Sequence, residues 1–289
     1  MSAVLYDVPG PKARLRNRGL GGVGTLVLLC VVGFVAYRFA VTGQFDGAKW
    51  EFLEFKAIQL LLLDALLNTL TAFAVAAVLA LLFGAVFAAG RLSEHTWISR
   101  PATVVVEFFR AVPLLVLIFI LYFGVSKSLG IEISTFWAVV LGLMLYNGSV
   151  LAEVFRAGVD SLPRGQSEAA YGLGMRKTQV MTSVLLPQAL RAMLPTIVSQ
   201  LVVVLKDTAL GYLILYPELL YQARYLGGQG QLGSPILQVA IVIAVIYIAM
   251  CLLLSALANL LERRTHRSAK TGPTDTTATP DAETDLTNL

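Results

Sequence analysis

The residues best placed to do chemistry are charged side chains inside otherwise apolar segments. Glu107 and Arg110 are three positions apart, and so are Glu153 and Arg156. Side chains at this spacing share one face of a helix, so each carboxylate can pair with its arginine. Ionisable groups are costly inside a bilayer and are therefore candidates for ion pairing or for contact with a solute. Of these two interpretations, structural pairing is the one we favour for both pairs.

Lys206 and Asp207 form the deepest charged site in an apolar segment. Adjacent side chains do not face each other on a helix, so at least one of them needs a partner elsewhere or a watery cavity. A role in a solute pathway or gate is as well supported as a structural role. Other polar residues in apolar segments can either face a solute or hydrogen-bond between helices. They are Asn68, Thr69, Tyr146 and Asn147.

Catalytic and metal-binding constellations are absent from the sequence. His95 and His266 lie beside basic residues, with no partner at metal-ligand spacing. Cys30 and Cys251 lie in apolar segments, where a thiol behaves as a small hydrophobic group. The glycine cluster at 227–230 has no following lysine, and no Gly-x4-Gly-Lys-Ser/Thr motif occurs. We therefore expect no catalytic residue, no metal site and no nucleotide bound by this chain.

The composition indicates an integral membrane protein. Of the 289 residues, 57% are hydrophobic and 14% are charged, with a mean hydropathy of +0.74. Soluble domains average roughly 45–50% apolar and about 25% charged residues. Apolar segments of about 20 residues are long enough to cross a bilayer as helices. Six such spans are predicted, at 20–41, 66–90, 102–125, 134–154, 194–216 and 236–260.

Orientation follows from the lysine and arginine bias of the connecting segments. With both termini on the cytoplasmic side, fifteen of the 22 basic residues fall inside, four fall outside and three lie within spans. The apolar run 20–41 is too long for the apolar core of a signal peptide, roughly 7–15 residues, so we predict a retained first helix. Pro113 is expected to kink or loosen the third span. The outer segment 42–65 fits either an interfacial helix or a plain loop.

The longest internal cytoplasmic segment, 155–193, is too polar to span a membrane. It predicts two short helices joined by a turn. Ser167 is a candidate N-cap, and Gly172 and Gly174 offer a break or a C-terminal cap. The second helix is expected to begin near Lys177 and to be interrupted by Pro187.

This segment resembles the EAA loop of type I importer permeases of the ABC superfamily. The pattern EAA-x3-G-x9-I-x-LP is met by Glu168-Ala169-Ala170, Gly174 and Leu186-Pro187, and the one departure is Val184 for isoleucine. Further segments resemble the polar-amino-acid permeases of that superfamily. They are Glu107–Leu115, Ala152–Gly158, Pro187–Arg191 and Leu205–Leu210.

The resemblance implies an all-α membrane fold of about six transmembrane helices and a role in which a cytoplasmic knob docks on a separate ATPase. It divides the chain into a cytoplasmic segment 1–19, an extra helix 20–41, a permease domain 66–260 with its coupling loop at 160–190, and a disordered tail 263–289. The implied coupling residues are Gln166, Glu168, Ala169, Ala170, Gly174, Leu186 and Pro187. The candidate solute pathway comprises Asn68, Thr69, Arg110, Pro113, Tyr146, Asn147, Glu153, Lys206 and Asp207.

The implied partners are two ATP-binding subunits, which would hold ATP and Mg, together with a second permease chain (paralogous or identical) and an extracytoplasmic solute-binding protein. The implied location is the bacterial cytoplasmic membrane, in contact with membrane lipid and without nucleic acid. A polar amino acid, and glutamate in particular, is the expected solute. An ion-coupled secondary transporter and a non-transporting scaffold remain alternatives, and a membrane-embedded enzyme lacks a catalytic constellation.

Overall fold

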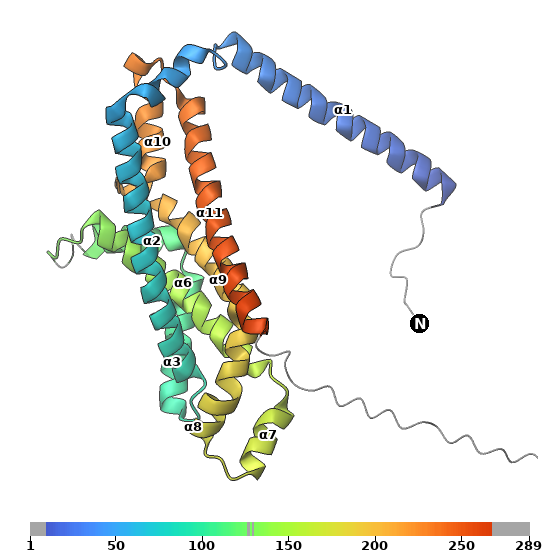
Figure 1. The fold of residues 1–289 in the computed structure, drawn as a ribbon, viewed down its shortest axis with the longest axis vertical. Coiled ribbons are helices and arrows are strands. Elements are labelled where there is room, and N and C mark those ends of the chain that lie inside the picture. The colour runs from blue at the N-terminus through green and yellow to red at the C-terminus, as the bar shows by residue number, and fades with distance from the viewer. Residues whose placement is uncertain (1–9, 126–127, 129, 268–289) are drawn as a thin grey trace, which may run out of the picture. The chain divides into compact units, whose positions relative to one another are not determined.

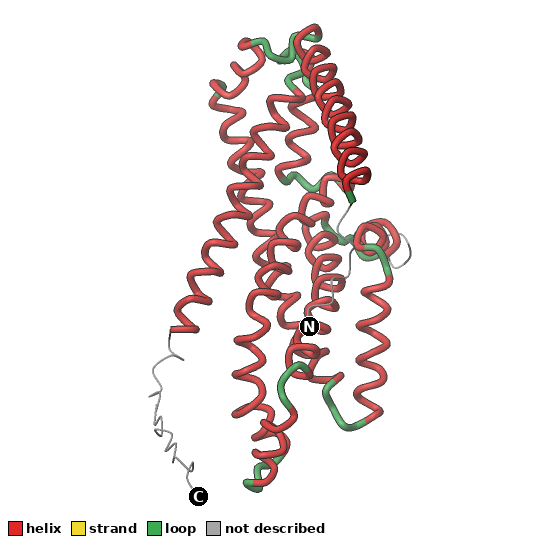
Figure 2. The backbone as a smooth tube through the Cα atoms, turned by 90° about the vertical axis from the view of Figure 1, so that its right-hand side faces the viewer, coloured by secondary structure: helices red, strands yellow, loops and turns green. Residues whose placement is uncertain are grey.

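The computed structural model describes residues 10–125, 128 and 130–267, and these form helices joined by short loops (Figures 1 and 2). Two compact units are distinguished, unit 1 (1–68 and 217–246) and unit 2 (69–216 and 247–289). The α-helices are α1 (Pro11–Val41), α2 (Lys56–Arg91), α3 (Thr96–Ala111), α4 (Leu114–Phe119), α6 (Thr135–Asp160), α7 (Arg164–Gly172), α8 (Lys177–Gln179), α9 (Leu186–Asp207), α10 (Leu219–Gly227) and α11 (Ile236–Arg267). The 3₁₀ segments are η1 (Gly47–Glu54), η4 (Thr208–Ile214) and η5 (Gly230–Leu232), and the π-helical segments are η2 (Ile120–Val125) and η3 (Val180–Leu185).

The all-α class and the expected number of spans are confirmed. Five helical segments are long and apolar enough to cross a membrane, and a bent pair of helices brings the number to six in the described residues. The observed helices extend beyond the predicted spans, since α2 begins at Lys56 and α6 continues to Asp160. At the chain ends, α1 already begins at Pro11 and α11 continues to Arg267. The rest of the predicted tail, 268–289, and the first nine residues lie outside the described residues.

The third predicted span is broken at Pro113, as expected. Helix α3 ends at Ala111 and α4 begins at Leu114, with a bend of 98° between them. Val112 has an extended backbone (φ −83°, ψ 128°), which is the conformation that a following proline favours. Pro113 also has no N–H for a helical hydrogen bond, so the bend coincides with the one residue that cannot donate.

The core of unit 2 depends on a stripe of small residues along α2. Ala72, Ala76 and Ala80 are fully buried, and Gly84 continues the same four-residue spacing. A Cβ atom on Gly84 would lie 2.9 Å from Leu151 Cβ and 3.1 Å from the carbonyl oxygen of Gly148 on α6. Two membrane helices approach this closely where small residues meet, because packing replaces the hydrophobic effect inside lipid.

Helix α9 is longer at its N-terminal side than the sequence predicted. Helices α8 and α9 and the π-helical η3 between them form one continuous helical segment, which with η4 runs from Lys177 to Ile214. The expected interruption at Pro187 is therefore wrong. Pro187 lies in the first turn of α9, directly after the wide π turn, where a proline ring is tolerated and its missing N–H is not needed.

In unit 1, the segment 42–65 contains the 3₁₀ helix η1 and the first turns of α2, so a plain loop is not observed there. Glu218 is fully buried and caps α10, because its carboxylate accepts hydrogen bonds from the backbone N–H groups of Leu220 and Tyr221, both at 2.7 Å. The side chain of Gln238 donates to the backbone oxygen of Gln44.

Candidate functional site

The segment that matched the EAA pattern forms helix α7 and the turn after it, at the end of unit 2 where α6 ends (Figure 1). The helix ends in a Schellman motif: Met175 N–H donates to the Ala170 oxygen (3.2 Å) and Gly174 N–H to the Tyr171 oxygen (2.9 Å). Gly174 has φ +77°, a left-handed conformation that glycine adopts without steric cost. The predicted capping role of Gly174 is therefore confirmed.

The start of α7 differs from the prediction. The helix begins at Arg164, after Pro163, so Ser167 lies inside its first turn and is not the N-cap. Instead, the Ser167 hydroxyl donates to the backbone oxygen of Arg164 at 2.8 Å. The serine was misassigned because the helix begins earlier than expected, directly after Pro163, so Ser167 is already a helical residue and cannot occupy the N-cap position.

Helix α7 presents an open surface. Gln166, Glu168 and Ala169 are exposed, whereas Ala170 is buried against the rest of unit 2. The two apolar side chains Tyr171 and Leu173 are also exposed, Leu173 by 84%. A short helix that combines one carboxylate, small residues and uncovered apolar side chains has the composition of a protein docking surface.

The other two predicted coupling residues lie beside α7 rather than on it. Leu186 and Pro187 are exposed in the first turn of α9. The side chain of Gln188 donates to Gln166 Oε1 at 3.4 Å and so joins α7 to this turn. The structure therefore brings the whole coupling set to one end of unit 2, where α7 also packs against the π-helical η3.

An ion-pair network lies near the ends of α2, α3 and α6. The predicted pairs Glu107–Arg110 (3.3 Å) and Glu153–Arg156 (2.6 Å) are both present. Arg91, which the sequence analysis did not single out, joins them: its guanidinium lies 2.8 Å from Glu153 and 3.4 Å from Glu107. The network continues from Arg156 to the carboxylate of the last residue of α6, Asp160. Arg110 and Glu153, both predicted for the solute pathway, are thus held in ion pairs.

A polar cluster lies on the buried face of α6 and α9. Asn147 is fully buried, and its side-chain oxygen accepts a hydrogen bond of 2.6 Å from Gln200. The carboxylate of Asp207 lies against the same asparagine. Gln200 was missed by the sequence analysis, although it lies seven positions before Asp207 and therefore on the same helix face. Tyr146 is half-buried and packs on the hydrophobic core beside this cluster.

Lys206 lies on a different side of α9 from its neighbour Asp207, since consecutive helical residues are about 100° apart around the axis. It is exposed and lines a cavity of about 520 Å³ between α9 and α11, together with Ser199 and Ser255 and a set of apolar side chains. In the described part of the chain Lys206 makes no ion pair. The two remaining candidates, Asn68 and Thr69, are not brought to this cluster: Asn68 donates to the backbone oxygen of Pro217 (3.0 Å), and Thr69 is fully buried.

These features define a class of protein: a multi-span membrane protein with a short exposed helix between two spans and no nucleotide-binding motif in its sequence. The model of the family described as "Binding-protein-dependent transport system inner membrane component" matches residues 80–267, more than half of the chain. The chain belongs to this family, and the resemblance seen in the sequence is confirmed. It is a transport subunit rather than an enzyme.

Three relatives illustrate the similarity. The glutamate transport system permease protein GluD of Corynebacterium glutamicum is 40% identical over 225 residues, which cover 77% of this chain and 81% of the relative. The probable glutamine ABC transporter permease protein GlnP of Bacillus subtilis is 35% identical, over 70% of this chain and 92% of the relative. The arginine transport system permease protein ArtQ of Bacillus subtilis is 31% identical, over 70% of this chain and 91% of the relative.

Solved structures show the same fold. A crystal structure of an amino acid ABC transporter with histidines superposes with a TM-score of 0.67 at 32% identity, covering 74% of this chain and 98% of that chain. An inward-facing MetNI methionine ABC transporter has a TM-score of 0.59 at 18% identity, covering 73% of this chain and 99% of that chain. This second similarity concerns the fold alone.

Proposed function

We propose that this chain is the permease subunit of an ATP-driven amino-acid importer in a bacterial cytoplasmic membrane, with both termini in the cytoplasm. The observation that carries the proposal is helix α7, a short exposed helix that bears Glu168-Ala169-Ala170 and is followed by the left-handed Gly174. A family match over residues 80–267 and relatives named as amino-acid permeases support it.

In this proposal, α7 docks on a separate ATPase subunit that binds ATP and Mg. The small side chain of Ala169 permits close approach, and Glu168 supplies a charge that can pair with the partner. Movement of α7 passes to the membrane helices through two connections: the short link from Asp160 to Arg164, and the contact between Gln166 and Gln188 at the start of α9. One permease chain would form half of the pathway, so the assembly comprises two permease chains, two ATPase subunits and an extracytoplasmic binding protein.

The proposed solute is a polar amino acid, with glutamate as the first choice because the 40% identical relative is named a glutamate permease. Lys206 supports an anionic solute, since it is a cation within the membrane-spanning segment that has no ion-pair partner among the described residues. The cluster of Asn147, Gln200 and Asp207 supplies further polar groups between α6 and α9.

Solute uptake in vesicles that contain the complete transporter tests the proposal. We expect Glu168→Lys to reduce uptake and ATP hydrolysis by about ten-fold or more, because a reversed charge at a docking contact costs at least ~1.4 kcal/mol. Glu132→Lys is the matched control, since Glu132 is also exposed but lies outside α7. Unchanged uptake in Glu168→Lys would refute the docking role, and uptake that persists when ATP hydrolysis is blocked would favour an ion-coupled transporter.

A further inference from the structure

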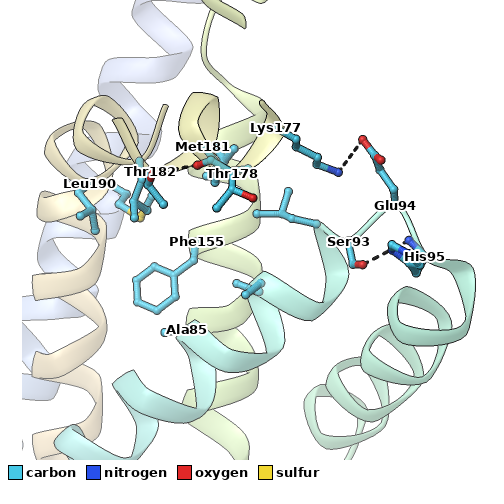
Figure 3. A pocket seen from close by; sticks show the side chains of 16 residues that line it. Ala85, Ser93, Glu94, His95, Phe155, Lys177, Thr178, Met181, Thr182 and Leu190 are labelled. Atoms are coloured by element: carbon cyan, nitrogen blue, oxygen red, sulfur yellow. Dashed lines mark hydrogen bonds and ion pairs between the residues drawn. The ribbon is translucent and has the colours of Figure 1, made fainter. Parts of the chain in front are cut away.

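A second cavity, of about 520 Å³, lies at the end of α2 and is walled by α6, α9 and the π-helical η3 (Figure 3). Its volume falls within the range of roughly 300–1,000 Å³ that is typical of small-molecule sites. None of the residues predicted for coupling or for the solute pathway lines it except Leu186, and no role is yet assigned to it.

The two ends of this cavity differ in chemistry. The deep walls are apolar and include Ala85 and Ala89 on α2, Phe155 on α6, and Leu190 and Met193 on α9. The rim is polar. In Figure 3 Ser93, Glu94, His95 and Lys177 lie on the side away from Phe155 and Ala85, and Thr178 lies between them and Thr182. The rim residues are Ser93, Glu94, His95, Lys177 and Thr178.

The rim has hydrogen-bond donors available for an anion. Lys177 pairs with Glu94 at 2.8 Å, and both side chains are exposed to solvent. The Ser93 hydroxyl accepts from the backbone N–H of His95 at 3.3 Å, and its own proton has no acceptor among the described residues. The hydroxyl of Thr178 also makes no hydrogen bond within the described chain. Two hydroxyls, an imidazole and the Lys177 ammonium group, which already pairs with Glu94, thus line one opening.

The cavity lies at the boundary between apolar and polar surroundings. Ala85 and Ala89 belong to the span of α2, which ends at Arg91, so the rim follows directly after the membrane-spanning segment. Trp97 is 72% exposed and its ring lies 6.2 Å from that of His95. Exposed tryptophans beside the end of a span mark the headgroup level of a bilayer.

We propose that this cavity binds one phospholipid of the surrounding bilayer, with an acyl chain against the alanine and leucine walls and the phosphate at the rim. A polar amino acid is a poorer match, because it would find partners at the rim alone and would either leave the apolar walls unfilled or place charged groups against them, which is costly. A lipid satisfies both ends: the chain buries apolar surface and the phosphate accepts from Ser93, Thr178 and Lys177. Because η3 forms one wall and also packs against α7, a bound lipid contacts a segment that packs against the proposed docking helix.

The test is photo-crosslinking in bilayers that contain the full chain, with phosphatidylcholine and phosphatidylglycerol carrying a diazirine at the acyl end. We expect label on 85–89 and 186–193 to exceed label on the exposed segment 26–35 of α1 by about ten-fold, which corresponds to ~1.4 kcal/mol of preference over bulk lipid. Equal labelling of the three segments, or weaker labelling of 85–89 and 186–193 than of 26–35, would overturn the proposal.

A cavity-filling variant gives an independent check. Ala89→Trp should lower the label on 186–193 by about ten-fold relative to the native chain, because the indole occupies the acyl site. Val86→Trp is the matched control: Val86 is 67% exposed on the same helix and does not line the cavity. If Ala89→Trp does not accumulate, the comparison of segments in the native chain still decides. None of these results depends on which solute is carried.

Discussion

The guanidinium of Arg91 lies 2.8 Å from the carboxylate of Glu153 and thereby ties the end of α2 to α6. The Arg91 side chain is 9% exposed and that of Glu153 is 26% exposed, so the contact is intermediate between a surface pair and a buried one. Surface pairs contribute roughly 0–1 kcal/mol, whereas removal of one partner from a buried pair costs about 3–5 kcal/mol. An effect of about 2 kcal/mol is therefore expected here.

Arg91→Met should lower the thermal unfolding midpoint of the purified protein by several degrees, because Glu153 and Glu107 each lose their ion pair with Arg91. Arg100→Met is the control, because Arg100 is exposed and makes no ion pair within the described residues. Adding Glu153→Gln to Arg91→Met should cost less than the sum of the single changes. If the midpoint shifts of the two single changes simply added up in the double variant, the ion-pair network would be contradicted.

The sequence predicted the parts of this site that depend on local spacing. The pairs Glu107–Arg110 and Glu153–Arg156 follow from helical periodicity, and the break at Pro113 follows from the missing N–H. Arg91 and Gln200 were missed because their partners, Glu153 and Asn147, are distant in sequence, and only the packing of α2 and α9 on α6 brings them together. Pro187 was misjudged because the π turn before it has no local signature in the sequence.

Gly174→Ala tests the end of α7. A Cβ atom at position 174 would meet nothing within 4 Å, so the entire cost comes from the φ of +77° and amounts to roughly 1–2 kcal/mol. We expect less uptake and weaker coupling to ATP hydrolysis, because the docking helix loses its fixed end. Gly172→Ala is the control, since Gly172 is helical and equally uncrowded, and it should be neutral or slightly stabilising. Identical behaviour of the two variants would exclude a role for the left-handed conformation.

The exposed pair Glu94–Lys177 makes the stability of the fold depend on pH, and the direction of this dependence follows from the pKa of Glu94. The hydrogen bond from Lys177, followed by its charge, lowers the pKa of Glu94 below its ordinary value of 4.5. A carboxylate with a lowered pKa contributes stability above its ordinary pKa and loses that contribution as the pH falls through the lowered value. The difference in unfolding midpoint between the native chain and Glu94→Gln should thus be present at neutral pH and absent in strong acid.

High salt provides a second check on this pair. Because the two side chains are exposed, added salt should shrink the neutral-pH difference between the native chain and Glu94→Gln. A difference that is independent of both pH and salt would mean that the glutamine variant acts through packing instead of charge.

Lys206 offers the sharpest test of how an anionic solute is recognised. If its ammonium group contacts the solute, Lys206→Met should raise the KM for glutamate uptake by about ten-fold or more, because a charge-assisted hydrogen bond contributes roughly 1.5–3 kcal/mol. Lys206→Arg should retain part of the affinity, and Lys56→Met, at an exposed lysine at the start of α2, should change nothing. Competition by unlabelled glutamine separates two modes of contact. A contact with the α-carboxylate weakens both solutes equally in Lys206→Met, whereas a contact with the side-chain carboxylate weakens glutamate alone. An unchanged KM for both would place Lys206 outside the solute path and make the cavity between α9 and α11 a packing surface.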